Sequence, residues 1–246
     1  MLENTAYIGL SRQLVLHRQM DMIANNITNM NTTAYKAQMM MFAEYLVPQG
    51  QTGASAMGHV MSMVQDLAMM RQMTQGVIKQ TGNSLDLAIQ GKGYFVVETP
   101  EGLRYTRNGR FMTDLEGLLV NRAGHPVLDV DSRVIELNPG DPNLDISTDG
   151  TVSTSAGAVA RIQVATFQDE QELEELGNSL YASKERPELA ETPQILQGAL
   201  EGSNVNAIGE MTQMMKVLRS YQSIQRMLSA NHEMQRRSIR TMGKVA

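Results

Sequence analysis

The first 30 residues carry a hydrophobic pattern with the period of a helix that packs against another helix. Between Leu16 and Met30, apolar residues recur at spacings of four, three, four and three, which is the repeat of a coiled-coil seam. We predict a helix over residues 3–30, ended by the polar cluster at 29–33, whose side chains compete for backbone hydrogen bonds. The full seam consists of Leu10, Leu14, Leu16, Met20, Ile23, Ile27 and Met30.

A second long amphipathic helix is predicted near the other end of the chain. The run Ser203-Asn204-Val205-Asn206 offers an N-cap, and the helix is expected to extend to about Met242. Because a helix with an apolar seam is marginal alone in water, we predict that the two terminal helices pair with each other or with neighbouring copies. The stripe of the second helix consists of Met211, Met214, Leu218, Tyr221, Ile224 and Leu228.

Between the helices the pattern changes to period 2. Alternation begins at residues 85–90, and the apolar run 94–97 follows a Gly-Lys-Gly turn. Turn signals such as Asn108-Gly109 and Asp149-Gly150 divide the later short runs, as in β-hairpins. This pattern predicts an antiparallel β domain with a barrel-like core. A short helix near 169–177 and a strand at 194–201 complete the prediction.

The predicted fold class is α+β, with a discontinuous domain. Residues 1–45 and 203–246 would form a terminal helical, coiled-coil-like assembly domain, and residues 85–202 a central β-rich domain. Residues 46–84 are rich in Gly, Gln, Ser and Met and are predicted to be an extended connection with one or two short strands. The 20 Met residues suit adaptable interfaces between subunits or an adaptable core.

Composition excludes several kinds of chemistry. The 246 residues contain no Cys, so disulfides, thiolate metal sites and Cys nucleophiles are absent. Net charge is −5, no apolar run is long enough to cross a membrane, and we expect no cleaved secretory signal. Charge is uneven, with a net of −7 over residues 169–201 and +5 over 202–246. We interpret the basic end as a solvated helical face, because no aromatic residues interleave it to suit nucleic acid.

Candidate chemical sites are weak. Gly91-Lys92-Gly93 is followed by a strand-like run, so we predict a hairpin turn and not a phosphate loop. His125, Asp129 and Asp131 could be metal ligands, but we interpret them, like the carboxylates at 141, 145 and 149, as solvated loop residues. No Gly-x-Ser-x-Gly motif is present. The prediction is no catalytic residue, no metal and no cofactor.

Four stretches, in order along the chain, carry a family resemblance. Residues 22–36 read MIANNITNMNTTAYK, residues 80–95 read QTGNSLDLAIQGKGYF, residues 105–111 read YTRNGRF and residues 200–206 read LEGSNVN. Each resembles a motif of the rod–hook axial proteins of the bacterial flagellum, and the opening residues 7–13 are most similar to those of the proximal-rod members. The motif residues are Ala24, Asn25, Asn26, Asn29, Thr32, Lys36, Leu85, Asp86, Ser203, Asn204, Val205 and Asn206.

The resemblance implies a structural subunit of the flagellar basal-body rod. Its partners would be copies of itself and other rod proteins, and the flagellar type III apparatus would export it to the periplasm without signal cleavage. From the net charge and the lack of a long apolar run we also expect no nucleic-acid partner and no membrane insertion. One departure is Ala34, where the family usually has Gly, so we expect a differently shaped turn. Within the family, the distal-rod proteins are also similar.

Two other classes of function stay open from the sequence. A soluble coiled-coil module could present its β domain to a single partner, in which case a small closed oligomer is expected. An enzyme would need a deep pocket with convergent ionisable groups.

Overall fold

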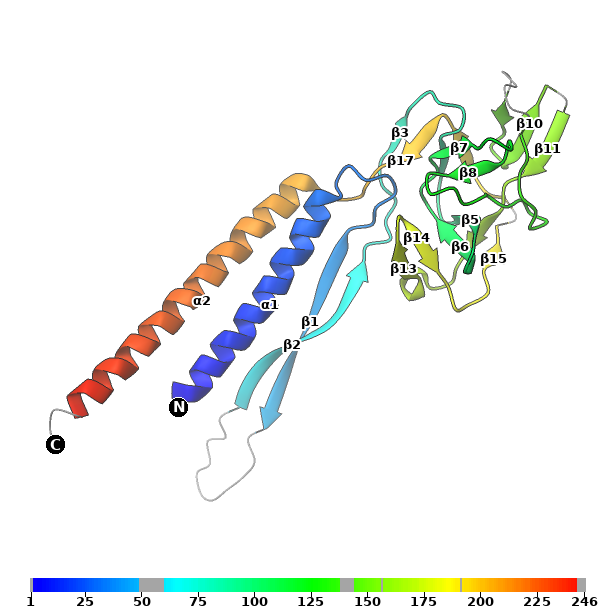
Figure 1. The fold of residues 1–246 in the computed structure, drawn as a ribbon. Helices are drawn as coiled ribbons and strands as arrows, with labels where there is room; N and C mark the ends of the chain where they lie inside the picture. The colour runs from blue at the N-terminus through cyan, green and yellow to red at the C-terminus, as the bar shows by residue number, and fades with distance from the viewer. Residues whose placement is uncertain (1, 49–59, 138–143, 156, 191, 243–246) are drawn as a thin grey trace. The chain divides into compact units, whose positions relative to one another are not determined.

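The computed structural model describes residues 2–48, 60–137, 144–155, 157–190 and 192–242 (Figure 1). The chain has an α+β fold, with a helix at each end and antiparallel strands between them. It divides into two compact units. The helical unit contains residues 1–28, 38–71 and 206–246, and the β unit contains residues 29–37 and 72–205.

The helical unit contains two helices and one hairpin. Helix α1 spans Leu2–Thr28 and helix α2 spans Ala207–Met242. Strand β1, Gln38–Pro48, pairs antiparallel with β2, Val60–Arg71. The helices contact each other and α1 also contacts both strands, so the predicted pairing of the terminal helices is confirmed within one chain.

The hairpin is the main difference from the sequence-based division. Residues 46–84 are predicted to be an extended connection with one or two short strands, whereas residues 60–71 form one strand of 12 residues, in register with β1. The run Val60–Arg71 contains Asp, Gln and Ser among its Met and Val residues, so its own alternation is weak. Its partner strand supplies the ladder of hydrogen bonds, which local sequence patterns do not reveal.

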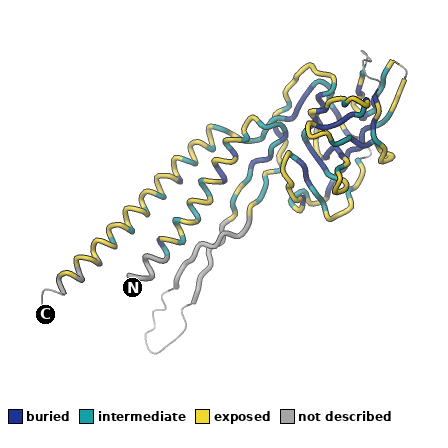
Figure 2. The backbone as a smooth tube through the Cα atoms, in the orientation of Figure 1, coloured by how far each residue is buried: buried dark blue, intermediate teal, exposed yellow. Residues whose placement is uncertain are grey.

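A small apolar core joins the helices of this unit. Ile23 is fully buried, with Met22 and Val217 beside it. Further along the pair, Gly9 of α1 lies against the side chain of Leu228, which a Cβ on Gly9 would meet at 2.8 Å. Figure 2 shows that the rest of α2 is mostly exposed, with half-buried positions at regular intervals.

The β unit is built from several small antiparallel sheets. The largest has six strands in the order β13-β14-β6-β5-β12-β15, and a three-stranded sheet has the order β11-β10-β9. The pairs β16-β4, β17-β3 and β7-β8 complete the described strands. Their bounds are β3 Ile78–Gln80, β4 Leu87–Ile89, β5 Tyr94–Thr99, β6 Gly102–Thr106, β7 Phe111–Thr113, β8 Leu119–Asn121, β9 Asp145–Ile146, β10 Thr151–Thr154, β11 Gly157–Arg161, β12 Val164–Thr166, β13 Glu174–Gly177, β14 Leu180–Ala182, β15 Glu188–Leu189, β16 Ile195–Gln197 and β17 Ala199–Glu201.

Strand β5 separates two apolar cores. Phe95 and Val97 join one cluster, which includes Phe111 at 5.1 Å between ring centroids. Tyr94 and Val96 join the other, on the opposite face of the strand. Successive side chains of a strand point to opposite faces, so a run of four buried residues is what a strand covered on both sides requires.

Two predicted hairpin turns have a different role. Gly91-Lys92-Gly93 connects β4 to β5, and Asn108-Gly109 connects β6 to β7, but in both cases the flanking strands pair with other partners. Gly109 is needed for close packing, because a Cβ there would lie 1.7 Å from the carbonyl oxygen of Leu87. The amide of Leu87 in turn donates to the carbonyl of Gly109 at 2.9 Å.

The segment predicted as a short helix at 169–177 is mostly not helical. A 3-10 helix, η1, spans only Glu170–Glu172, and the strand β13 follows at once. Asp169 caps η1 by accepting a hydrogen bond from the amide of Gln171. The strand predicted at 194–201 is present as β16 and β17, separated by Gly198 with φ of 71°.

Candidate functional site

Three of the sequence motifs meet in the β unit at one buried carboxylate. Glu201 is 1% exposed and binds Lys36 Nζ at 2.7 Å through one oxygen and Arg107 Nη1 at 2.8 Å through the other. The first oxygen also accepts the backbone N–H of Gly76 at 2.9 Å. Lys36 lies in the first motif, Arg107 in the third and Glu201 in the fourth, so this motif junction ties together residues far apart in the chain.

The electrostatics of the junction are those of a desolvated ion cluster. Burial lowers the pKa of Lys36, and Glu201 acts in the opposite direction by stabilising the charged ammonium. Arg107 also donates to the carbonyl of Gly91 and lies over the ring of Tyr94, 5.4 Å from its centroid. Removing one partner from such a cluster costs about 3–5 kcal/mol, because the remaining charges stay buried and uncompensated.

Asn204 extends the junction through its side-chain amide. Its oxygen accepts from the backbone N–H of Ala37 at 2.7 Å, and its nitrogen donates to the carbonyls of Gln72 and Thr74. The backbone N–H of Asn204 donates to the carbonyl of Tyr35. One Asn therefore connects three segments of the β unit, which explains why the motif places an amide at this position.

Asn26 likewise connects two segments of the helical unit through its side-chain amide. It is fully buried, and its side chain both donates to the carbonyl of Gln38 and accepts from its N–H, each at 2.9 Å. The amide thus acts as a strand partner for the first residue of β1. Beside it, burial raises the pKa of Glu210 on α2, an effect opposed by a hydrogen bond with Asn26.

The remaining motif residues have local roles. Thr32 donates to the side chain of Asn29 at 3.0 Å where α1 has ended. Asn206 accepts the N–H of Gly209 and is the N-cap of α2. Ala34 has a left-handed conformation, with φ of 59°, although its Cβ makes this conformation less favourable than it is for Gly. Its N–H donates to the carbonyl of Glu201 at 2.9 Å, so the tertiary contact holds the turn despite the Cβ.

The other motif positions also lie in described structure. Asp86 is buried, and its carbonyl accepts the N–H groups of Gly198 and Ala199. Ser203 accepts the N–H of Val205 at 3.2 Å through its hydroxyl oxygen. The remaining members of the motif set are Ala24 and Asn25, which are exposed on α1, and Leu85, which is half-buried.

The predicted stripe of α2 divides into two seams. The inner seam faces α1 and consists of Met214, Val217, Tyr221, Ile224 and Leu228, which are buried or half-buried. The outer seam consists of Ile208, Met211, Met215 and Leu218, which are 79%, 48%, 53% and 43% exposed. Each seam has the alternating three- and four-residue spacing of a helix-packing face, so α2 has one covered and one uncovered face.

The seam of α1 is divided in the same way. Leu16, Met20 and Ile27 pack around the buried Ile23. Leu10 and Leu14 are more than half exposed and Met30 is 36% exposed. The structure therefore buries or half-buries eight of the 13 predicted assembly residues in a single chain and leaves the other five exposed.

The candidate metal residues have other roles. The side chain of Asp129 accepts the N–H groups of Asp131 and Arg133, which forms a turn. His125 donates its backbone N–H to Asn121. Hydrogen bonds from Thr151 lower the pKa of the exposed Asp149. Within the described residues, no group of three or more His, Cys, Asp or Glu side chains could hold a metal ion, and no helix has the length and apolarity of a membrane span.

A cavity of about 420 Å³ lies beside the motif junction, and three of its four ionisable lining residues are engaged in the fold. Arg107 binds Glu201, Asp169 caps η1, and Glu170 accepts the hydroxyl of Tyr94 at 3.2 Å. Burial is the main cause of the raised pKa of Tyr94, which keeps that hydroxyl protonated. These contacts favour a structural role for the cavity lining.

Sequence reasoning missed four features of the site. Arg107 lies in the third motif and Glu201 in the fourth. Their opposite charges beside apolar runs were the sequence signal for a buried ion pair. Val217 and Met215 belong to two interleaved stripes on one helix. The single stripe predicted for α2 mixes residues of the inner and the outer seam, because both seams repeat at spacings of three and four residues.

Comparison with known proteins identifies the family. Residues 7–36 match the model described as "Flagella basal body rod protein", residues 88–154 match "Flagellar hook protein FlgE/F/G D1 domain", and residues 196–241 match "Flagellar basal body rod FlgEFG protein C-terminal". These ranges contain most of the motif residues described above.

Full-length relatives agree. The chain is 38% identical to the flagellar basal-body rod protein FlgF of Caulobacter vibrioides, over 99% of this chain and 100% of that protein. It is 30% identical to FlgF of Mesorhizobium japonicum, over 98% and 99%, and 30% identical to the rod protein FlgG of Bacillus subtilis, over 92% and 94%. The chain therefore belongs to the flagellar basal-body rod protein family, whose members are structural components of the basal body and not enzymes.

Proposed function

We propose that this protein polymerises through its terminal helices to help form the rod that transmits motor torque to the hook. The observation that carries the proposal is the pair of uncovered apolar faces, Leu10 and Leu14 on α1 and the outer seam on α2. Exposed apolar residues at helix-packing spacing indicate a surface that is buried in an assembly. Family membership already implies assembly with other rod proteins.

We also propose how the protein is exported and where it assembles. The protein passes through the flagellar type III apparatus without signal cleavage and assembles in the periplasm, in the proximal part of the rod. The helical unit forms the assembly domain, and the β unit is held as a compact body by its motif junction. A rod subunit needs contacts that continue from copy to copy and do not close into a dimer.

The sharpest test places a charge in the outer seam. Met215→Asp changes an exposed residue, so the free chain is expected to fold with little loss of stability. In an assembly the same Asp would be buried without a partner, at a cost of several kcal/mol for each copy. We expect normal secretion and loss of motility and hook formation in cells that carry only this variant.

The matched control is Ser223→Asp, which adds the same charge to an exposed position of α2 that lies off the outer seam. We expect it to be motile. A motile Met215→Asp strain would contradict assembly through the outer seam. A small closed oligomer of the purified chain, with no defect in the flagella of cells that lack it, would favour a soluble binding module.

A further inference from the structure

Charge is sorted between the two units. The helical unit contains 10 basic and 6 acidic residues, a net of +4, and the β unit contains 11 basic and 20 acidic residues, a net of −9. Within the β unit, the segment 169–177 has five acidic residues and no basic one. Within the helical unit, the end of α2 from Arg226 to Arg240 has four arginines and one glutamate.

The arginines of α2 form one face. At 100° per residue, Arg226, Arg237 and Arg240 lie on the side of the helix turned away from the inner seam, and Arg236 lies at the flank of this group. Glu233 lies among them, 3.9 Å from Arg237. The outer seam lies on the same side, nearer the start of α2. This face of α2 is therefore apolar near the start of the helix and basic from Arg226 onward, and all four arginines are exposed.

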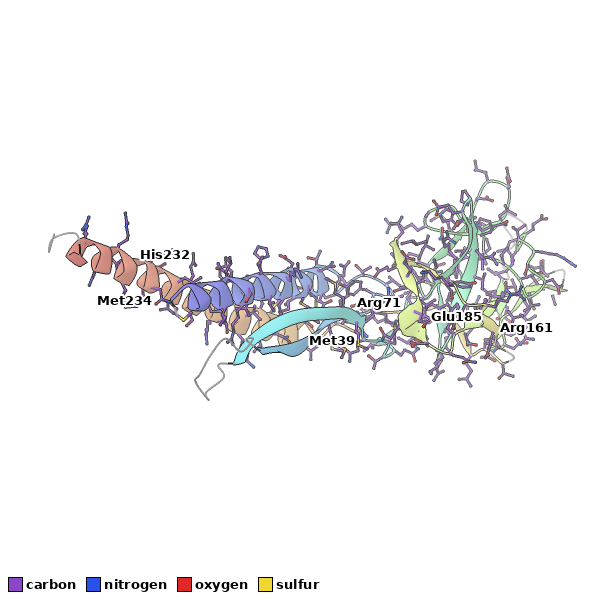
Figure 3. The ribbon with its side chains drawn as sticks, turned by 90° about the horizontal axis from the view of Figure 1, so that it is seen from below. Met39, Arg71, Arg161, Glu185, His232 and Met234 are labelled. Carbon is purple, nitrogen blue, oxygen red and sulfur yellow. The ribbon has the colours of Figure 1, made fainter. Side chains whose placement is uncertain are left out.

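The basic face lies far along the helix. Arg236 is 29 residues beyond Ala207, which is about 44 Å along the axis. Figure 3 shows side chains, including those of His232 and Met234, projecting from this end of α2. A 53% exposed Met234 beside the arginines suits a partner that offers both carboxylates and apolar surface.

The acidic segment of the β unit offers that combination. Strand β13 is an edge of the six-stranded sheet, with all four of its residues exposed. Glu174 and Glu175 precede Leu176, which is 47% exposed, and Glu172 is exposed just before the strand. Acidic charge also prevents two such edges from pairing with each other, so an edge of this kind selects a basic partner.

We propose that the basic face of α2 in one copy docks on the acidic segment 169–177 of a second copy of this chain. The proposal rests on the proposed function, because polymerisation is what brings the two surfaces together in every subunit. The contact joins different surfaces of identical chains and can therefore repeat along an axis without closing. It adds a salt-sensitive contact of opposite charges to the apolar contact of the outer seam.

The absence of cysteine allows a direct test. Cells express two versions of the full chain together, one with Arg236→Cys and the other with Glu174→Cys, and basal bodies are oxidised and separated without reductant. Each version has a single Cys, so a disulfide between the two versions joins two copies. We expect this mixed dimer, and none when Glu174→Cys is replaced by Glu136→Cys, another exposed acidic position.

A second experiment exchanges the charges of the two surfaces. Arg236→Glu with Arg240→Glu should lower incorporation into basal bodies about tenfold, since two exposed ion pairs become repulsive. Adding Glu172→Lys and Glu174→Lys to the same chain should restore it. A control with Glu172→Lys and Glu174→Lys alone should be as defective as the arginine variant.

The outcomes separate the two proposals. If the cysteines form no mixed dimer and the charge variants are silent while Met215→Asp abolishes assembly, the docking proposal is wrong and the proposed function stands. If Met215→Asp is silent as well, both fail. If the arginine variant is not rescued and the purified chain binds phosphatidylglycerol vesicles through its arginines, the basic face serves an anionic membrane, which also overturns the docking proposal.

Discussion

The two units of this chain solve the problem of burying apolar surface in different ways. The β unit encloses two apolar clusters on the two faces of β5, and its long-range ties converge on Glu201. Among the side chains that the structure describes in the helical unit, the buried apolar cluster is a short contact around Ile23, and a second apolar seam lies on the surface of α2 (Figure 2). The comparison teaches that one unit is complete in a single chain, whereas the other presents surface for further contacts.

Both units use one buried polar residue from a family motif, but with different chemistry. Asn26 is a neutral amide that pairs with the N–H and the carbonyl of Gln38 and also forms a hydrogen bond with Glu210. Glu201 is a charge held by two cations. A neutral amide costs little to bury when its hydrogen bonds are satisfied, whereas a buried charge makes the site intolerant of losing any partner.

The largest expected effect is at the motif junction. Glu201→Gln keeps the shape of the side chain but leaves Lys36 and Arg107 buried without an anion. We expect a loss of about 3–5 kcal/mol in the stability of the β unit. Hydrogen exchange of the full chain should show it as faster exchange in β3 and β17, with little change in α1.

The control for this change is Glu98→Gln, an exposed residue of β5. It is expected to stay within about 0.5 kcal/mol of the original chain. Equal protection of β3 and β17 in Glu201→Gln and Glu98→Gln would show that the ion cluster does not stabilise the β unit.

A smaller effect should separate covered from uncovered seam residues in the helical unit. Ile23→Ala removes a fully buried side chain and is expected to cost about 2–4 kcal/mol. Leu14→Ala, at a position 58% exposed, should cost less than about 0.5 kcal/mol in the free chain. Thermal unfolding followed by helical circular dichroism measures both.

The motility of cells that carry these variants tests the same comparison in the assembled flagellum. If the outer surfaces are assembly contacts, Leu14→Ala should impair the flagellum in spite of its normal stability. A Leu14→Ala chain as unstable as Ile23→Ala would mean that Leu14 is covered in the free chain, contrary to the structure.

The smallest effect concerns pH. The pKa of Glu210 is raised by burial, and its Oε2 atom is buried without a hydrogen-bond partner. The folded chain therefore binds this proton more tightly than the unfolded chain, so the stability that protonation provides is present at low pH and is lost as pH rises through the raised pKa. Glu210→Gln should stabilise the helical unit at neutral pH by up to about 1 kcal/mol.

The measurement is the unfolding midpoint of α2 at about pH 4 and pH 7. The gain in Glu210→Gln should shrink toward pH 4, where Glu210 is mostly protonated in both the folded and the unfolded chain. Glu233→Gln, at an exposed position, is the control and should show no such gain. A gain that grows toward acid pH would contradict the assigned direction of the pKa shift.

The sequence by itself determined the terminal helices, the β-rich middle and the family. Seams at the helix-packing period and the capping residue Asn206 are local signals, because they depend on residues a few positions apart. The motif at 200–206 likewise identified the start of α2. For the same reason, the strands β16 and β17 were found within a stretch predicted as strand.

Only the tertiary structure decided which surfaces are covered and which residues meet. Residues 60–71 became a strand because β1 lies beside them, and the left-handed Ala34 is held by a bond to Glu201, 167 residues away. Two interleaved seams on α2 have the same period, so periodicity cannot tell which one faces α1. Pairings between distant residues, such as Lys36 with Glu201, depend on the path of the whole chain, and that path is not written in any local pattern.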